Sequence, residues 1–343
     1  MVFALVTGLA IVLGAVLSAA QAAPVGKLTQ FRVPTDNSQP RHITVGSDGN
    51  LWFTEGNEIF TPNPDDPDAP GTTHRNIGKI TPSGEVTEFR IDSRDGESPL
   101  PNQCDCLLND IVQGPSGILY FTTNNPGLGR ITTGGDVLAF VAPNNNLANG
   151  GGIAARDNAI WYTDFNNDSL WRYDVSSEQF TEFPVPAPGT DPLDVAVASD
   201  GTVWFSGGDA IGSLDPQSGV FTRTPVLGSS PRFIAIASDG KVWFTDRFNH
   251  RVGYLDPSTN QVTQFATLTP NAGPLDIAAA PTGGSVWFTQ TLTGNVARAT
   301  PAGVITEGKA VRNSDPFGIT IGPGGNPWYT MSSANKIARL TLN

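Results

Sequence analysis

The chain has 343 residues, a formal net charge of −12 at pH 7, and only 15% charged residues. This acidic balance argues against nucleic acid or anionic lipid as a partner, because their phosphates repel a negatively charged surface. The 38 glycines and 28 prolines accompany a normal hydrophobic content of 38%, which excludes a disordered chain and suits many short strands joined by tight turns.

The N-terminal segment differs from the rest of the chain. Residues 1–21 carry no charged side chain, are largely apolar from Val2 to Leu17, and end in the small-residue pattern Ala20-Gln21-Ala22. These features predict a secretory signal peptide over residues 1–22, with an uncleaved membrane anchor as the alternative. We therefore expect a secreted, extracellular protein whose mature part, residues 23–343, is one monomeric domain without a membrane partner.

One short phrase recurs seven times along the chain. It is an aromatic pair, usually followed by Thr, at Trp52-Phe53, Tyr120-Phe121, Trp161-Tyr162, Trp204-Phe205, Trp243-Phe244, Trp287-Phe288 and Trp328-Tyr329. Apart from a longer first interval, the copies are about 40 residues apart, a period typical of β-propeller blades. The repeat predicts an all-β fold, a seven-bladed β-propeller with four-stranded antiparallel blades.

The fifth copy shows how one blade is built. Its four strands are expected at residues 232–236, 241–245, 250–255 and 261–266. Successive side chains of a strand point to opposite faces, so Trp243 and Phe244 should pack against different neighbouring blades.

Both ends of the domain are expected to share one blade. The last copy stops after a third strand at residues 336–342, whereas residues 27–33 match the fourth-strand phrase at residues 261–265. We predict that residues 27–33 pair with the C-terminal blade, which closes the ring and leaves no free edge there.

The long first interval holds two insertions, residues 57–76 and 92–107. Strand direction assigns both to the upper face, the face on which each first strand begins and the blades are linked. They would form a lid over the central channel or an inert flap. Cys104 and Cys106 lie in the second insertion, where they would close a tight disulfide or remain thiols, and a structural zinc site is disfavoured because it needs four ligands.

The repeat has a further motif beside the aromatic phrase. Its fullest copy runs as Pro-x-x-Ile, a turn with Gly, Leu-Trp-Phe-Thr-Glu and Ile-Gly-x-Ile-Thr-x-x-Gly, at residues 40–55 and 77–84. With this phrase over nearly the whole mature chain, the protein resembles the virginiamycin B lyases (streptogramin lyases) and, more loosely, gluconolactonase-like and NHL-repeat propellers. The resemblance implies a propeller enzyme that opens a cyclic depsipeptide by metal-assisted elimination.

The chain departs from that family where the resemblance would place histidine bases and a metal-binding Glu. Those positions in the last two blades hold Leu275, Gln290, Phe317 and Met331. None of these side chains can abstract a proton or hold Mg²⁺ firmly. The sequence is therefore that of a divergent member, in which cleavage of streptogramins by the family's machinery is not expected.

Two sets of positions are expected at the upper mouth of the channel: the residues that open each first strand, and those that follow each aromatic phrase. The first set is Arg41, Asn109, Gly151, Leu193, Arg232, Leu275 and Phe317; the second is Glu55, Thr123, Asp164, Gly207, Asp246, Gln290 and Met331. The predicted substrate-binding residues are Arg41, Asn109, Arg232 and Phe317. They suit a small organic molecule with an apolar body and an anionic or polar end.

Acids and histidines supply the remaining candidates. The predicted catalytic residues are His42, Glu55 and Asp246, with His74 as a further proton acceptor. Oxygen ligands for a divalent cation, Mg²⁺ or Ca²⁺, are Glu55, Asn109, Asp164 and Asp246, provided that they converge across the channel. The alternative is that Arg41 with Glu55, and Arg232 with Asp246, form structural ion pairs.

Three further acids recur in alternate blades, directly after the strand-opening residue: Asp110, Asp194 and Asp276. We expect them to accept backbone N–H groups between blades rather than to catalyse. Asn167-Asp168-Ser169 matches a glycosylation acceptor. Two functions follow from the whole set: an enzyme that acts on a small cyclic or esterified natural product by elimination, isomerisation or lactone opening, or a secreted propeller that binds a ligand without chemistry.

Overall fold

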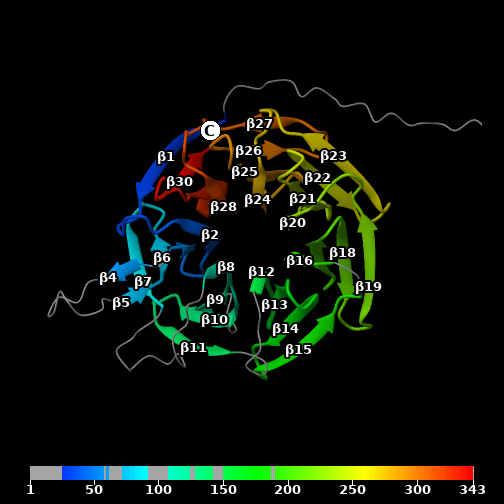
Figure 1. Ribbon diagram of the computed structural model, residues 1–343, viewed down its shortest axis with the longest axis horizontal. Helices are drawn as coiled ribbons and strands as arrows, with labels where there is room; N and C mark the ends of the chain where they lie inside the picture. The colour runs from blue at the N-terminus through cyan, green and yellow to red at the C-terminus, as the bar shows by residue number, and fades with distance from the viewer. Residues whose placement is uncertain are drawn as a thin grey trace, which may run out of the picture.

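Seven four-stranded antiparallel sheets surround a central axis in the computed structural model (Figure 1). The structure describes residues 25–57, 59–61, 72–91, 107–123, 128–141, 150–186 and 190–342. The predicted signal peptide, Cys104, Cys106 and most of the two insertions lie outside these residues. The seven-bladed propeller is confirmed.

Each blade places its first strand at the axis and its fourth strand at the rim (Figure 1). Blades 1 and 2 are β2 (Pro40–Val45), β3 (Leu51–Glu55), β6 (Asn76–Ile80), β7 (Val86–Arg90) and β8 (Leu108–Gln113), β9 (Ile118–Thr123), β10 (Leu128–Thr132), β11 (Val137–Val141). Blades 3 and 4 are β12 (Gly150–Arg156), β13 (Ala159–Asp164), β14 (Ser169–Asp174), β15 (Gln179–Pro184) and β16 (Pro192–Val197), β17 (Val203–Gly207), β18 (Ala210–Asp215), β19 (Val220–Pro225).

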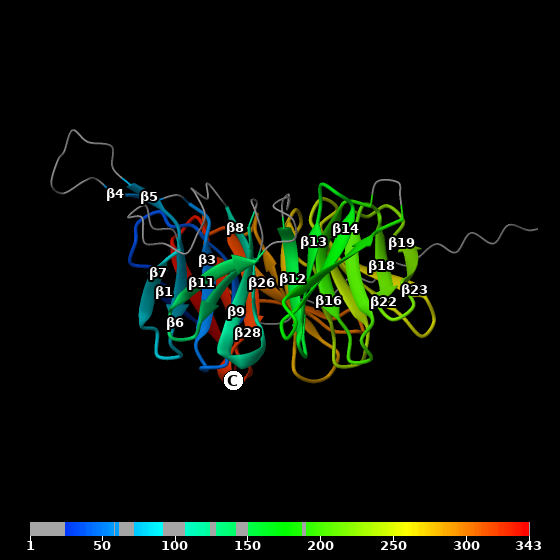
Figure 2. The same ribbon diagram turned by 90° about the horizontal axis from the view of Figure 1, so that it is seen from below.

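The other three blades repeat the pattern. Blades 5 and 6 are β20 (Ile234–Ile236), β21 (Val242–Asp246), β22 (Arg251–Asp256), β23 (Gln261–Ala266) and β24 (Pro274–Ala279), β25 (Val286–Gln290), β26 (Asn295–Ala299), β27 (Ile305–Glu307). Blade 7 is β28 (Pro316–Ile321), β29 (Pro327–Met331), β30 (Lys336–Thr341) and β1 (Lys27–Arg32). A small hairpin of β4 (Ile59–Thr61) and β5 (Thr72–His74) extends from blade 1 on the upper face, at the top of Figure 2.

In the described part of the chain no helix is long and apolar enough to cross a membrane.

The two ends of the domain meet in blade 7, as predicted. Strand β1 pairs antiparallel with β30, from Lys27 opposite Thr341 to Arg32 opposite Lys336. The Asn335 side chain extends this seam, since its amide nitrogen donates to the carbonyl of Thr35 at 2.7 Å. The ring is therefore held closed by the N-terminal strand.

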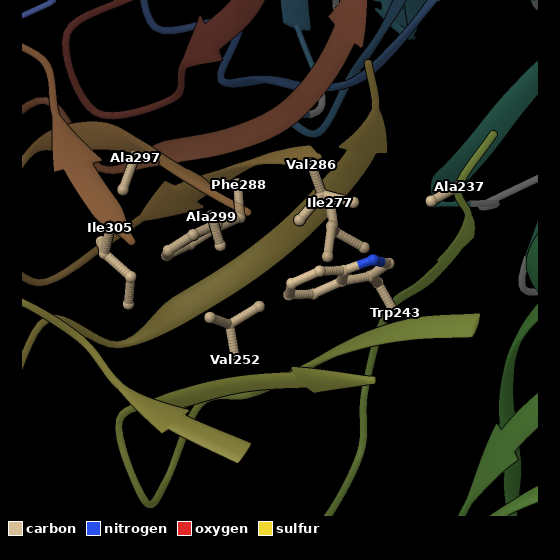
Figure 3. Close-up of a cluster of buried hydrophobic side chains, with 9 residues drawn as sticks. All are labelled: Ala237, Trp243, Val252, Ile277, Val286, Phe288, Ala297, Ala299 and Ile305. Carbon is tan, nitrogen blue, oxygen red and sulfur yellow. The ribbon is translucent and has the colours of Figure 1, made fainter. Parts of the chain in front are cut away.

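The aromatic pairs fill the wedges between blades. The Trp243 ring packs on blade 6 against Ile277, Val286 and Phe288 (Figure 3). Its neighbour Phe244 packs in the opposite direction, in a cluster that includes Ile211 of blade 4. Adjacent rings on opposite faces of one strand therefore join three consecutive blades, which confirms the role expected for the phrase.

The hydroxyl group after each aromatic pair links each blade to the next. In blade 1, Thr54 Oγ1 donates to the Asn109 carbonyl of blade 2 at 2.9 Å and accepts the His42 N–H at 3.2 Å. The corresponding hydroxyls of Thr122, Thr163, Ser206, Thr245, Thr289 and Thr330 donate to the carbonyls of Gly151, Leu193, Arg232, Leu275, Phe317 and Arg41. Seven hydroxyls thus form a continuous ring around the axis, the hydroxyl ring. It explains why the phrase ends in Thr or Ser.

A bulge interrupts the first strand beside this ring. Pairing shifts register between Leu108 and Ile111, for example, and equivalent shifts occur in the first strands of five other blades. In blade 5 the expected strand at residues 232–236 is shortened to β20, because Arg232 and Phe233 both face Thr245 through backbone hydrogen bonds of 3.0 Å. Such bulges re-aim side chains, so consecutive residues are able to face the same space.

Candidate functional site

A cavity of about 220 Å³ opens at the upper end of the channel, on the side of blades 1 to 5. Its walls include His42, Asn109, Asp110, Phe165, Arg232 and Phe233. The bulges explain why the consecutive pairs Asn109-Asp110 and Arg232-Phe233 both line it. A volume of this size accommodates one end of an organic molecule rather than a whole drug-sized ligand.

The floor of the cavity on blade 3 is formed by Gly150, Gly151 and Gly152. A Cβ atom at Gly152 would lie only 2.1 Å from Asp194 Oδ1, so blade 3 approaches blade 4 too closely for any side chain there. Because these three glycines carry no side chains, the cavity extends over blade 3. This feature was visible in the sequence as three consecutive glycines at the start of a strand.

Three aspartates below the mouth join neighbouring blades. Asp194 accepts the backbone N–H of Val195 in its own blade and that of Ile234 in the next blade, both at 2.8 Å. Asp110 and Asp276 make the same two kinds of hydrogen bond, to Ile111 and Ile153 and to Ile277 and Ile319. Their structural role is confirmed, and each carboxylate ties one pair of blades together.

An odd number of blades leaves blade 1 outside this alternation, and His42 occupies the equivalent position there. Its Nδ1 atom lies 3.4 Å from Asp110 Oδ1 and 3.9 Å from Asp276 Oδ2. The Phe317 ring stands edge-on to the imidazole, with ring centroids 5.1 Å apart, and Phe233 is tilted against it at 5.4 Å. With 8% of its surface exposed, His42 is the histidine that the structure places in the cavity wall beside acidic groups.

The carboxyl groups of the three bridging aspartates influence one another. Burial raises the pKa of Asp194 well above its usual value, and the charge of Asp110 adds to this effect. Burial also raises the pKa of Asp276 to about 6, although His42 acts in the opposite direction. Burial therefore favours the protonated forms of Asp194 and Asp276.

Arginines lie at the rim of the same mouth. The Arg41 guanidinium stands over the Phe317 ring at 5.6 Å, and that of Arg232 over Phe248 at 5.9 Å. Burial is the main cause that lowers the pKa of both groups. Within the described residues neither Arg41 with Glu55 nor Arg232 with Asp246 forms an ion pair, so the structural ion pairs considered from the sequence are absent.

Glu55 lies away from the cavity, inside blade 1. It is fully buried, accepts a hydrogen bond from Asn76 Nδ2 at 3.2 Å, and interacts with the carboxyl group of Glu88. Burial, with the charge of Glu88, raises the pKa of Glu55 to about 9. Glu55 therefore carries a proton at neutral pH, and the described walls of the cavity do not include it.

Asp164 and Asp246 hold the loops that follow them. Asp164 accepts hydrogen bonds from the backbone N–H and the Nδ2 atom of Asn167, at 3.3 and 2.8 Å. Asp246 binds Asn249 in the same way, at 3.3 and 2.9 Å. Asn167, the predicted glycosylation acceptor, is exposed, but its amide nitrogen is engaged by Asp164.

The predicted ligands of a divalent cation do not gather in the described structure. Among the described residues no group of three His, Cys, Asp or Glu side chains is placed to hold a metal ion. At Gln290 both polar atoms of the buried amide lack a hydrogen-bond partner, yet one neutral amide does not supply the anionic oxygen ligands that Mg²⁺ and Ca²⁺ require. The donor set does not fit such a cation, and a metal at this mouth stays a prediction.

Two of the residues predicted from the sequence, Phe317 and His74, have not yet been placed. Phe317 contacts both His42 and Arg41, so it joins the cavity wall to the rim. The His74 side chain lies outside the described residues. Phe165 and Phe233, which the sequence did not single out, reach the cavity through a loop and through the bulge of blade 5.

Known structures share this architecture. The chain aligns over 93% of its length with 98% of a streptogramin B lyase at 24% identity and a TM-score of 0.77, which shows the shared fold. It aligns over 92% of its length with 99% of virginiamycin B lyase from Staphylococcus aureus, at 26% identity and a TM-score of 0.75. The same values apply to a catalytically inactive histidine-to-alanine variant of that enzyme with Quinupristin. No curated protein matches the chain.

The family comparison covers most of the domain. The profile of the Virginiamycin B lyase family matches two overlapping segments, residues 70–223 and 153–343. These segments include six of the seven aromatic phrases and most of the cavity wall. The chain belongs to the Virginiamycin B lyase family.

Proposed function

We propose that this propeller is a lyase-like enzyme that acts on a small cyclic or esterified compound, whose reacting end enters the cavity at the channel mouth. The observation that carries the proposal is the His42–Asp110 pair in the cavity wall, with Nδ1 and Oδ1 3.4 Å apart. A carboxylate beside one imidazole nitrogen favours the tautomer with its proton there, which leaves Nε2 to accept a proton. His42 is then the proton-transfer group, and Asp110 orients it.

A base and an arginine at the cavity are sufficient for an elimination reaction. His42 removes a proton from the carbon next to a carbonyl group, and the electron pair forms a carbon–carbon double bond. The ester C–O bond breaks and the carboxylate leaves, so a cyclic ester opens without water. Arg232, at the cavity wall, stabilises the negative oxygen that develops. The amide of Asn109 is oriented for substrate contact by its 2.6 Å hydrogen bond to the Gly150 carbonyl.

A non-catalytic binding protein is the second candidate. It is favoured by Leu275, Gln290, Phe317 and Met331, which occupy the positions where the family resemblance places bases and a metal ligand. Under this alternative the same cavity captures a ligand, and His42 serves only as a polar contact.

Mass spectrometry distinguishes these functions. The purified protein is incubated with a panel of cyclic depsipeptides, lactones and linear esters that includes Quinupristin. An opened product of unchanged mass with a new alkene indicates elimination, and a gain of one water indicates hydrolysis. We expect His42→Gln to lose turnover by about 10²-fold or more, the usual contribution of a general base. His250→Gln is the matched control, because its ring accepts a hydrogen bond from the Gly273 N–H outside the cavity. Equal turnover in both variants, or no turnover of any compound by the unaltered protein, rejects the enzyme.

We further propose export of the chain with removal of residues 1–22, on the basis of the apolar N-terminal segment. Intact-mass analysis of protein from the culture medium should give a mature chain that begins at Ala23. Elemental analysis of the same sample tests the predicted divalent cation.

A further inference from the structure

The arginines of the channel mouth differ from those of the outer walls. Arg172 pairs with Asp174 at 2.9 Å, and Arg223 pairs with Asp209 at 2.7 Å. By contrast, the structure gives Arg41, Arg232 and Arg247 no ion pair or side-chain hydrogen bond with any described residue. The charge of Asp315 reaches Arg41 and Arg247, but it is not among the causes that shift the pKa of Arg232.

Two of these cations belong to neighbouring segments, since the Arg232 guanidinium stands over the ring of Phe248, the residue after Arg247. Arg247 is close enough to Arg232 to lower its pKa by charge repulsion, in addition to the larger effect of burial. The Arg232 Nε atom is buried without a hydrogen-bond partner. The partly desolvated Arg232 guanidinium is unfavourable in the empty site, because a second positive charge acts on it and one of its N–H groups has no partner. An oxyanion on Arg232 relieves both the repulsion and the missing hydrogen bond.

Apolar surface surrounds this pair of charges. Phe248, whose side chain is 66% exposed, lies beneath the Arg232 guanidinium, and the 39% exposed Phe165 lines the adjoining cavity. Phe233, next to Arg232 in the bulge, continues this surface to His42. A ligand with its oxyanion on the arginines therefore covers the aromatic rings with its apolar body.

We propose that the channel mouth selects organic oxyanions, in which a carboxylate or phosphate ester group is held by Arg232, within the field of Arg247, while an aromatic or aliphatic body packs on Phe165 and Phe233. This inference rests on the proposed function, since it assigns the charge class of the substrate to the same mouth. It concerns equilibrium binding alone and needs no turnover.

Ligand-observed NMR titrations test this selectivity with phenylacetate, phenylacetamide and phenyl phosphate as probes. Phenylacetate and its amide have nearly the same shape and differ in charge, so their dissociation constants isolate the oxyanion contact. We expect phenylacetate to bind about tenfold more tightly than phenylacetamide, as for hydrogen bonds to a charged group. Salt should weaken phenylacetate binding more than amide binding.

Three variants locate the contact. Arg232→Gln and Arg247→Gln should each remove most of the preference for the acid over the amide. Arg251→Gln is the matched control, because it makes the same change of charge in the same blade, where Arg251 contacts Gln264 on the outer strand. Its preference should equal that of the unaltered protein.

Equal affinity for phenylacetate and phenylacetamide in the unaltered protein would overturn the inference. So would an undiminished preference in both mouth variants. A tighter complex with phenyl phosphate than with phenylacetate identifies phosphate esters as the ligand source, and the reverse order identifies carboxylates; both require the arginine contact. A failed turnover assay with intact anion binding rejects the enzyme and leaves this inference standing.

Discussion

Glu55 is a carboxyl group whose surroundings favour the protonated form. It is fully buried, has one oxygen without a hydrogen-bond partner, and faces Glu88, which is itself fixed by the N–H and hydroxyl groups of Thr35. A negative charge on Glu55 would be repelled by that of Glu88. The residue that the sequence offered as a base or metal ligand is thus a neutral hydrogen-bonding group inside blade 1.

Replacing Glu55 by Gln tests this assignment through the pH dependence of stability. A pKa raised from 4.5 to about 9 means that the contribution of Glu55 to stability is complete below pH 4.5 and is lost as the pH rises toward 9. Glu55→Gln should therefore gain stability relative to the unaltered protein between pH 5 and pH 8, by up to about 1.4 kcal/mol per pH unit. Urea unfolding at both pH values measures the difference, with the exposed Glu85→Gln as the control. If the free energy of unfolding changed equally between pH 5 and pH 8 for all three proteins, Glu55 would be ionised in the fold.

At the scale of the elements, the hydroxyl ring and the aspartates are two separate devices that connect neighbouring blades. Thr330 illustrates the first device: its hydroxyl accepts the Gly318 N–H at 2.8 Å within blade 7 and donates to the Arg41 carbonyl of blade 1. This contact spans the junction between the last blade and the first. It also holds the backbone beside His42 and Arg41, so it positions both the proposed base and the rim.

Thr330→Val should be strongly destabilising, although it conserves shape. The substitution leaves one buried N–H and one buried carbonyl without partners, at a cost of about 1–3 kcal/mol each. Thr330→Ser retains the hydroxyl group and should lose less than half as much. Free energies of unfolding from urea titrations provide the comparison. Similar stabilities of the Val and Ser variants would mean that the hydroxyl contributes nothing to the junction.

At the scale of the whole molecule, the N-terminal strand determines whether the ring stays closed. Strand β1 supplies the outer edge of blade 7, and its Phe31 ring stacks on Trp328 with centroids 5.5 Å apart. Val33, at the end of this strand, is completely buried. Loss of these residues would expose both the edge of β30 and a patch of core.

A truncated chain that begins at Thr35 should therefore aggregate or unfold at a lower temperature than the mature chain that begins at Ala23. Exposed strand edges with apolar surface are sites of aggregation. Size-exclusion chromatography and thermal unfolding measure both effects. A truncated protein that remains monomeric and equally stable would contradict closure by β1.

The sequence was sufficient for features that depend on the repeat alone. The period of Trp243-Phe244 and its counterparts predicted the blades, and the alternation of Asp110, Asp194 and Asp276 predicted their bridging role. Spacing within a blade did not reveal contacts across blades. Arg232 and Asp246 are 14 residues apart on neighbouring strands, yet Asp246 binds its own loop and Arg232 turns to Phe248.

The bulges were the main feature that the sequence concealed. Strict alternation would place His42 on the opposite side of its strand from Arg41, away from the mouth. A bulge breaks this alternation, so adjacent residues such as Asn109 and Asp110 face one cavity. The partner of His42 was hidden for a related reason, because Asp110 belongs to the next blade and the packing of blade 2 against blade 1 brings the two side chains together.

The proposed enzyme requires that His42 presents a free Nε2 while its Nδ1 proton faces Asp110. The chain contains only three histidines, so ¹⁵N-labelled imidazoles are assigned by His42→Gln and His250→Gln and their tautomers read by NMR at pH 8, where an ordinary imidazole is neutral. We predict that the His42 proton resides on Nδ1 and that Asp110→Asn shifts this tautomer balance. A proton on Nε2, unchanged by Asp110→Asn, would contradict the account.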